Sequence, residues 1–199
     1  MFYEDSIDGK APEEIDILVC AADQAFKMGT DLDEFSGKLY LVTFALLNNK
    51  TDIAMSVLFP IMCKTKPFIY SGWCSKKDIQ VLQFLNNEIH YIEYDNINEE
   101  VSNCYDIIFP KNVVHFVSEP IKYELFLQQC TKQWNFCLYH PVVYTFFLMF
   151  EITRKKNGQM TAENKILSKL ATFIGDCEGV TNVTELTVSL VSVITNVGE

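Results

Sequence analysis

The stretch that most constrains the fold is residues 66–109, because short apolar runs alternate there with a helical pattern. Residues 68–70 predict a short strand that is apolar throughout. Residues 90–94 and 107–109 have the same strand-like composition and follow later in the stretch. Elements that alternate in this way are typical of an α/β core.

A helix is expected between the first two of these strands. Ser75 can cap its N-terminus, and residues 86–87 end it. Its apolar residues recur on one helical face: Ile79, Leu82 and Leu85. The pattern therefore predicts a parallel βαβ-like unit at residues 67–109.

Two apolar runs, residues 39–47 and 53–62, precede this unit and are joined by a polar connection. They fit two antiparallel strands. They also fit two buried helices, because Thr51 or Asp52 can cap the second one. Continuous apolar runs do not separate these cases. Aromatic and β-branched residues favour a strand at 39–47, and the state of 53–62 stays open.

The run at residues 142–153 has the strongest strand composition in the chain, since it is β-branched and aromatic almost throughout. A run that is apolar on both faces predicts a central strand covered on both sides. Residues 112–117 predict a further strand, and residues 134–139 predict a short strand or loop.

Helices are expected at residues 12–29 and 161–175, and a third begins at Glu119-Pro120. The buried stripe of this third helix should contain Tyr123, Phe126, Leu127 and Cys130. The stripe of the C-terminal helix should contain Ile166, Leu167, Leu170, Phe173 and Ile174. Residues 184–195 suit a helix or a strand.

These patterns predict one α/β domain over residues 1–199, with a central mixed β-sheet flanked by helices. An acidic helical segment, residues 1–38, should pack on it. That segment has ten acidic residues and three lysines, so it carries −7 of the net charge of −10. It is a solvated face or a docking segment for a basic protein. The overall charge disfavours nucleic acid as a partner.

The seven cysteines form no CxxC pair and no spacing of a zinc module. The first residues are acidic and have no apolar core of a secretory signal. Reduced thiols in the cytoplasm are therefore expected. The longest apolar runs are about half of the roughly 20 residues that a membrane helix needs, so no membrane association is expected.

One loop lies where open α/β sheets bind ligands, after the first strand and before a helix N-terminus. Its residues are Ser71, Gly72, Trp73, Cys74 and Ser75. Lys76 and Lys77 could assist an anion there, and Asp95 follows the second strand as a ribose-binding acid does. The glycine-rich fingerprints of nucleotide-binding loops are absent from the sequence. A plain connecting turn is the alternative reading of the loop.

Cys74 stands at the expected helix start, where a helix dipole lowers the pKa of a thiol. A catalytic pair would need His90, His115 or His140 beside it. The apolar surroundings of His90 and His115 favour packed core histidines instead. Cys130, Cys137 and His140 have spacings that could bring them together, but they lack a fourth ligand for zinc. No catalytic residue, metal or cofactor is predicted.

The missing catalytic signatures and the aromatic content favour a non-enzymatic interaction or assembly protein. We expect protein partners and a homo-oligomer or larger particle, a role that also suits a virus-encoded structural or accessory protein. The alternatives are a small-molecule or nucleotide-binding α/β enzyme that uses the 71–75 loop, and an acidic adaptor that docks a basic protein.

Overall fold

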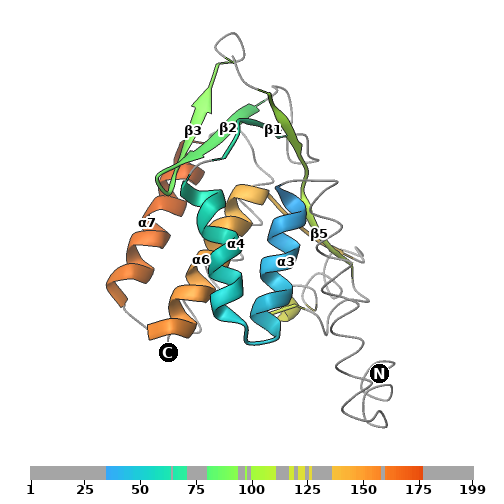
Figure 1. Cartoon of the computed structure of the whole chain (residues 1–199), viewed down its shortest axis with the longest axis vertical. Coiled ribbons are helices and arrows are strands. Elements are labelled where there is room, and N and C mark those ends of the chain that lie inside the picture. Colours follow the sequence, from blue (N-terminus) through green and yellow to red (C-terminus); the bar gives the residue numbers. More distant parts are fainter. Residues whose placement is uncertain are drawn as a thin grey trace.

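The computed structural model describes residues 35–63, 65–70, 80–93, 97, 100–110, 117–118, 121–123, 126, 136–157 and 160–176. In this part of the chain, helices lie side by side below a small sheet (Figure 1). The helices are α3 (Ser36–Leu47), α4 (Thr51–Cys63), α6 (Pro141–Asn157) and α7 (Met160–Asp176). The strands are β1 (Phe68–Tyr70), β2 (Gln80–Leu85), β3 (Glu88–Ile92), β4 (Ser102–Cys104), β5 (Ile107–Pro110) and β6 (Phe136–Tyr139).

The main sheet has the strand order β3-β2-β1-β4 and is mixed. Strand β1 pairs antiparallel with β2, with Phe68 opposite Leu82, and parallel with β4, with Phe68 opposite Ser102. Strands β5 and β6 form a separate antiparallel pair. The predicted α/β class with a mixed sheet is therefore confirmed, as are the strands at 68–70 and 107–109.

The helix predicted between Ser75 and residues 86–87 is wrong from Gln80 onward, because that segment is strand β2. Strands β2 and β3 form a hairpin in which Leu85 pairs with Glu88. Asn86 and Asn87 are the two turn residues, with φ values of 52° and 65°. Two successive positive φ values define the turn that matches strand twist, and asparagine tolerates them. The parallel pair β1–β4 is thus joined through a hairpin at 80–92.

The central strand predicted at residues 142–153 is also wrong, since helix α6 spans this run. The run is apolar all round because the helix is covered all round, by α3, α4 and α7. Pro141 occupies the first helical position, where proline is favoured. Thr145 and Thr153 donate hydrogen bonds to the carbonyls of Pro141 and Met149, 2.8 and 2.9 Å away.

Residues 39–47 form helix α3 rather than the favoured strand. Residues 53–62, whose state the sequence pattern does not decide, are helical and belong to α4. Asn48 donates from Nδ2 to the carbonyl of Phe44 at 2.8 Å, and Asn49 has a φ of 55°. An asparagine with positive φ after a helix is a common C-terminal stop. The polar connection is therefore a helix–helix turn.

The hairpin turn caps the C-terminus of α4. The N–H groups of Asn86 and Asn87 donate to the carbonyls of Cys63 and Met62, at 2.9 and 2.7 Å. These are carbonyls that the last turn of a helix leaves unpaired. Lys169 of α7 donates to the carbonyl of Asn87 at 2.8 Å. The hairpin is thereby fixed to the end of α4 and to the middle of α7.

One cluster of buried residues joins the helices to both sheets. Its largest fully buried side chains include Phe68 of β1, Phe84 of β2 and Phe146 of α6. Phe35 contacts Phe68 with ring centroids 4.5 Å apart. Aromatic side chains of the sheet and of α6 meet in this core among many aliphatic ones, and the ring centroids of Phe84 and Phe146 lie 6.0 Å apart.

The predicted C-terminal helix is confirmed as α7, with Leu170 and Phe173 buried. The predicted strand at 90–94 overlaps β3, and the short strand at 134–139 contains β6. The buried stripe of the helix after Pro120 is wrong for Tyr123 and Phe126, which are 56% and 61% exposed. The segments predicted at 12–29 and 184–195 lie outside the described residues, as does the strand predicted at 112–117 except for Val117, which lies in a bend. No helix in the described part is long and apolar enough to cross a membrane.

Candidate functional site

The loop predicted as a ligand site, Ser71, Gly72, Trp73, Cys74 and Ser75, lies outside the described residues. Lys76, Lys77 and Asp95 lie outside them as well. His115 and Cys130, possible partners in a catalytic pair or a metal cluster, are also outside. The candidate site is therefore built from surfaces and cavities in the described part of the chain.

The two described histidines differ sharply in their surroundings. His90 is exposed on β3, so the expectation of a packed core histidine is wrong there. His140 is 3% exposed, and its ring contacts Tyr70 and Phe173 with centroids 4.1 and 5.4 Å away. No three His, Cys, Asp or Glu side chains in the described residues are grouped to hold a metal ion.

His140 caps helix α6. Its Nδ1 accepts a hydrogen bond from the N–H of Val142 at 3.2 Å, one of the donors that a helix start leaves unpaired. Burial lowers the pKa of His140 to about 3. The side chain is therefore neutral at physiological pH, and it serves the structure of the helix start.

A second buried polar contact lies beside this histidine. The Tyr70 hydroxyl of β1 donates to Oδ1 of Asp106, which is 8% exposed and precedes β5. The bond joins the main sheet to the β5–β6 pair. Tyr70 also contacts the His140 ring, so the two sheets and the start of α6 meet at one buried cluster.

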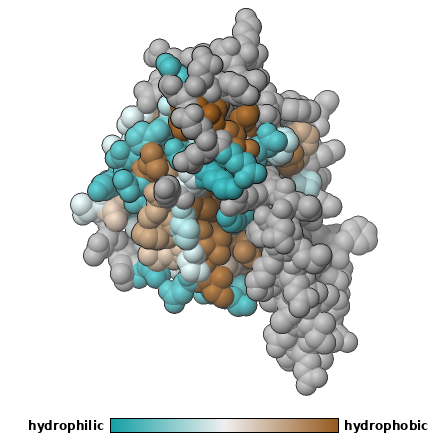
Figure 2. All heavy atoms as spheres, turned by 45° about the horizontal axis from the view of Figure 1, so that its top comes forward, coloured by the Kyte–Doolittle hydropathy of each residue, from teal (hydrophilic) through white to brown (hydrophobic). Residues whose placement is uncertain are grey.

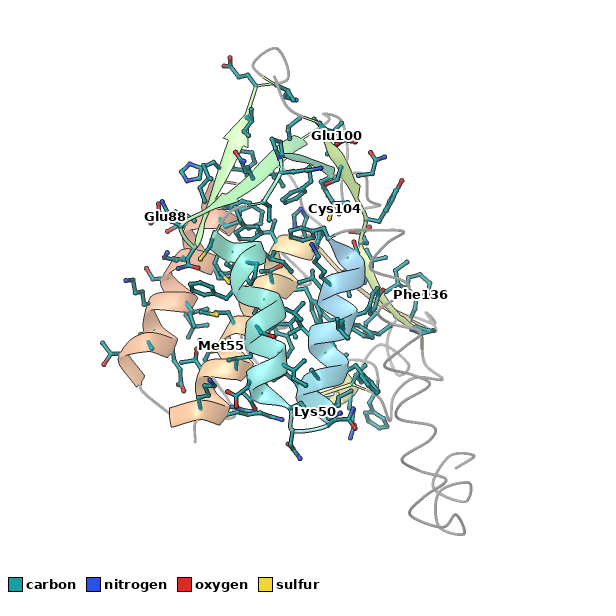
Figure 3. All side chains as sticks on the ribbon, viewed as in Figure 1. Lys50, Met55, Glu88, Glu100, Cys104 and Phe136 are labelled. Atoms are coloured by element: carbon teal, nitrogen blue, oxygen red, sulfur yellow. The ribbon has the colours of Figure 1, made fainter. Side chains whose placement is uncertain are left out.

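The outer surface of α4 is the most apolar exposed helix face in the described part of the chain. Ile53, Met55 and Phe59 are 47%, 37% and 50% exposed, and Ser56 and Pro60 are exposed between them. We call these five residues the α4 face. Met55 is labelled on α4 in Figure 3, and Figure 2 shows hydrophobic residues gathered at the surface in the middle of its view.

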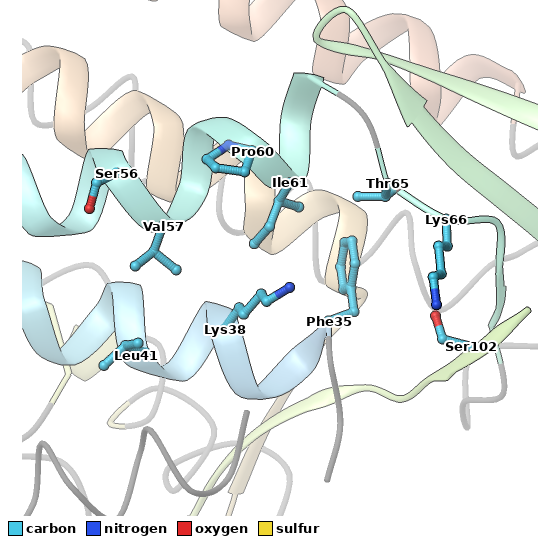
Figure 4. Close-up of a pocket in the computed structure, with 10 residues that line it drawn as sticks. All are labelled: Phe35, Lys38, Leu41, Ser56, Val57, Pro60, Ile61, Thr65, Lys66 and Ser102. Atoms are coloured by element: carbon cyan, nitrogen blue, oxygen red, sulfur yellow. The ribbon is translucent and has the colours of Figure 1, made fainter. Parts of the chain in front are cut away.

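A cavity of about 410 Å³ opens beside the α4 face (Figure 4). Ser56 and Pro60 of the α4 face form part of its wall. The rest of the wall comes from further α4 residues, from α3 and the residue before it, from the segment after α4 and from β4: Val57, Ile61, Phe35, Lys38, Leu41, Thr65, Lys66 and Ser102. In Figure 4, Lys38 reaches from α3 toward α4. The cavity is thus an apolar recess with two lysines in its wall.

The charges around the α4 face are few. Asp52 is the only charged residue of α4, and it pairs with Lys156 of α6 at 2.8 Å. The hydrogen bond and the charge of Lys156 hold the pKa of Asp52 below its usual value. Lys66, in the cavity wall, pairs with Glu100 at 3.2 Å. The face is therefore apolar and close to electrically neutral.

The sequence pattern did not single out this surface. Residues 53–62 are apolar in nearly every position, so their exposed positions cannot be told from their buried ones before the helix is known. Once α4 is established, the helical period separates Ala54, Leu58 and Ile61, which are buried, from Ile53, Met55 and Phe59. The signal is that both sides of this helix are apolar, although only one is covered.

Comparison with protein-family models, with curated proteins and with solved structures finds no match for this chain.

Proposed function

We propose that this chain is a non-enzymatic interaction protein that self-associates, and that two copies pack through the α4 face. The observation that carries the proposal is the exposure of Ile53, Met55 and Phe59 on one helix. Contiguous exposed apolar residues on a folded surface mark interaction sites. Phenylalanine and methionine are also enriched at interface cores, where charged residues are depleted.

Charge favours a second copy as the occupant. The chain carries a net charge of −10, so two copies repel one another except where the facing surfaces lack charge. The α4 face meets that condition, because its five residues are uncharged and the nearby Asp52 and Lys66 are paired with Lys156 and Glu100. A basic partner would gain nothing from a neutral apolar face. A twofold axis also makes one apolar helix face its own complement.

The geometry of α4 supports this packing. Proline at position 60 cannot donate to the Ser56 carbonyl, so the middle of the face lacks one helical hydrogen bond. Apolar side chains stand on both sides of that point. The adjacent cavity gives a recess that a large side chain of the second copy can enter. Two antiparallel α4 helices would bury Phe59 and Met55 of both copies.

The test is the concentration dependence of the molecular mass, which is measured by light scattering after size exclusion. Phe59→Glu places a charge at the centre of the interface twice, once from each copy, and should raise the dissociation constant of the dimer by at least about tenfold. Tyr105→Glu is the matched control, because Tyr105 is 51% exposed and Phe59 is 50% exposed. A chain that stays monomeric at high concentration, or equal effects of both variants, would sink the proposal.

A further inference from the structure

A second cavity, of about 220 Å³, lies between α3 and α6. It has room for about seven water molecules, since each takes about 30 Å³ in the liquid. Leu46 and Leu47 of α3 and Phe147 and Leu148 of α6 form its apolar wall. Among the described residues, none lines both this cavity and the one beside the α4 face, and none belongs to both this cavity and the α4 face.

Among the described residues of its wall, cations outnumber anions. Lys122, Arg154 and Lys155 line the cavity together with the carboxylate of Glu151. Lys155 donates to two neutral oxygens, the carbonyl of Leu46 at 2.8 Å and Oδ1 of Asn49 at 3.3 Å. Those contacts hold the ammonium group in place without cancelling its charge. The described part of the wall thus carries three cations and one carboxylate, although the whole chain is acidic.

Glu151 offsets only part of this positive charge. It is 4% exposed, and Nη2 of Arg154 lies 3.1 Å from Oε1 and donates to Oε2 at 3.2 Å. Burial raises the pKa of Glu151, while Arg154 and Lys155 oppose that rise. An arginine has five N–H donors in a planar fork, so contact with one carboxylate through Nη2 leaves others to serve a second oxyanion.

Two hydroxyl groups of the wall already use their protons in hydrogen bonds, and a third has no hydrogen-bond partner in the described part of the chain. Thr43 donates its only proton to the carbonyl of Leu39 at 2.8 Å, so the Tyr144 hydroxyl must donate to Thr43, 2.8 Å away. Burial raises the pKa of Tyr144, which keeps that proton in place. The Ser118 hydroxyl oxygen is buried and has no hydrogen-bond partner in the described part of the chain.

We propose that this cavity binds a small organic acid, with its carboxylate between Lys122, Arg154 and Lys155 and its apolar part against the leucine and phenylalanine wall. The cations supply charge-assisted hydrogen bonds to the carboxylate, which are stronger than neutral ones. The Ser118 hydroxyl gains a partner in the same step. The apolar wall selects an organic acid over inorganic phosphate, because phosphate leaves that wall without a contact.

Calorimetric titration of the full chain with hexanoate tests the inference, with hexanol and inorganic phosphate as comparison ligands. Hexanoate should bind, and each comparison ligand should bind at least about tenfold more weakly. Equal binding of hexanol would overturn the role of the cations, and equal binding of phosphate would overturn the role of the apolar wall. Absence of hexanoate binding would overturn the proposal as a whole.

Two adjacent lysines of α6 provide a matched pair of variants. Lys155→Gln removes a cation from the cavity wall and should weaken hexanoate binding about fivefold or more. Lys156→Gln removes the same charge one residue away, where the side chain pairs with Asp52 outside the cavity. Its effect should stay within about twofold. Equal losses of hexanoate affinity in the two variants would show that the overall charge of the chain matters and the position of Lys155 in the cavity wall does not, which would overturn the proposal.

The wild-type chain offers an independent readout, because Arg154 is its only arginine. Phenylglyoxal, which modifies arginine, should react at one arginine. Hexanoate should slow that reaction in proportion to the fraction of cavities that it occupies. Hexanol should leave the rate unchanged. A reaction rate at Arg154 that hexanoate does not alter would overturn the placement of the carboxylate.

Discussion

His140 lies where four elements of the fold meet. It follows β6 directly, caps α6 through Nδ1 and lies against Tyr70 of β1 and Phe173 of α7. Protonation of Nδ1 would remove the bond from Val142 and would place a positive charge at the positive end of a helix dipole. Burial in an apolar site adds to this, and the pKa of His140 falls to about 3.

This lowered pKa predicts a specific acid sensitivity. Between the folded pKa of about 3 and the usual value of 6.5, the unfolded chain binds a proton that the folded chain excludes. Stability therefore rises with pH in this window and is lost as pH falls from 6.5 toward 3. Going from about pH 8 to about pH 5 should cost roughly 2 kcal/mol from this residue alone.

His140→Asn tests the prediction, because asparagine can accept the same N–H bond but does not titrate. Urea unfolding at the two pH values should show that the variant loses about 2 kcal/mol less than the wild type does. The variant is less stable at neutral pH, since the ring contacts with Tyr70 and Phe173 are gone. His90→Asn is the control on an exposed strand position. Parallel pH curves for wild type and His140→Asn would refute the assignment.

At the scale of elements, the sequence predicts the class of fold but misassigns three elements, β2, α3 and α6. The strands β1, β5 and β6 and the helix α7 follow from their local patterns. The run at 142–153 does not, because its β-branched and aromatic residues suit a strand and also suit a helix that is buried all round. Tertiary burial decides the case, and a local pattern does not report burial.

Signals that pointed to the correct elements lay at the ends of those runs. Pro141 suits the first position of a helix, and Arg154, Lys155 and Lys156 suit the negative end of its dipole. Asn86-Asn87 suits a two-residue hairpin turn as well as a helix end. End signals therefore carry more information here than the apolar content between them.

The hairpin turn predicts the order of stability of two Asn86 variants, and a helix at this position would reverse that order. Asn86 is exposed and has a φ of 52°, a region that glycine enters freely and alanine enters at a cost. Asn86→Ala should lower the free energy of unfolding by about 1 kcal/mol, and Asn86→Gly should change it by less than about 0.5 kcal/mol. Thermal unfolding measures both. In a helix the alanine variant would be more stable than the glycine variant. An alanine variant that is the more stable of the two would therefore contradict the hairpin.

At the scale of the whole molecule, the candidate surfaces depend on which side of each helix is covered. The α4 face consists of ordinary apolar residues that become unusual only because neighbouring helices leave them exposed. The second cavity likewise combines Glu151 and Arg154 of α6 with Ser118 from a distant segment. Neither juxtaposition is visible in the order of residues, whereas the absence of glycine-rich loops and CxxC pairs is.

If two copies meet at the α4 face, a mixed sample of isotope-labelled and unlabelled chains shows it through contacts between copies. Filtered nuclear Overhauser effects report only contacts between different copies. We expect contacts from the Met55 methyl group of one copy to the Phe59 ring of the other, because an isologous helix pair places these residues across the axis. A sample with the mass of one chain, or contacts confined to methyl groups away from α4, would contradict it.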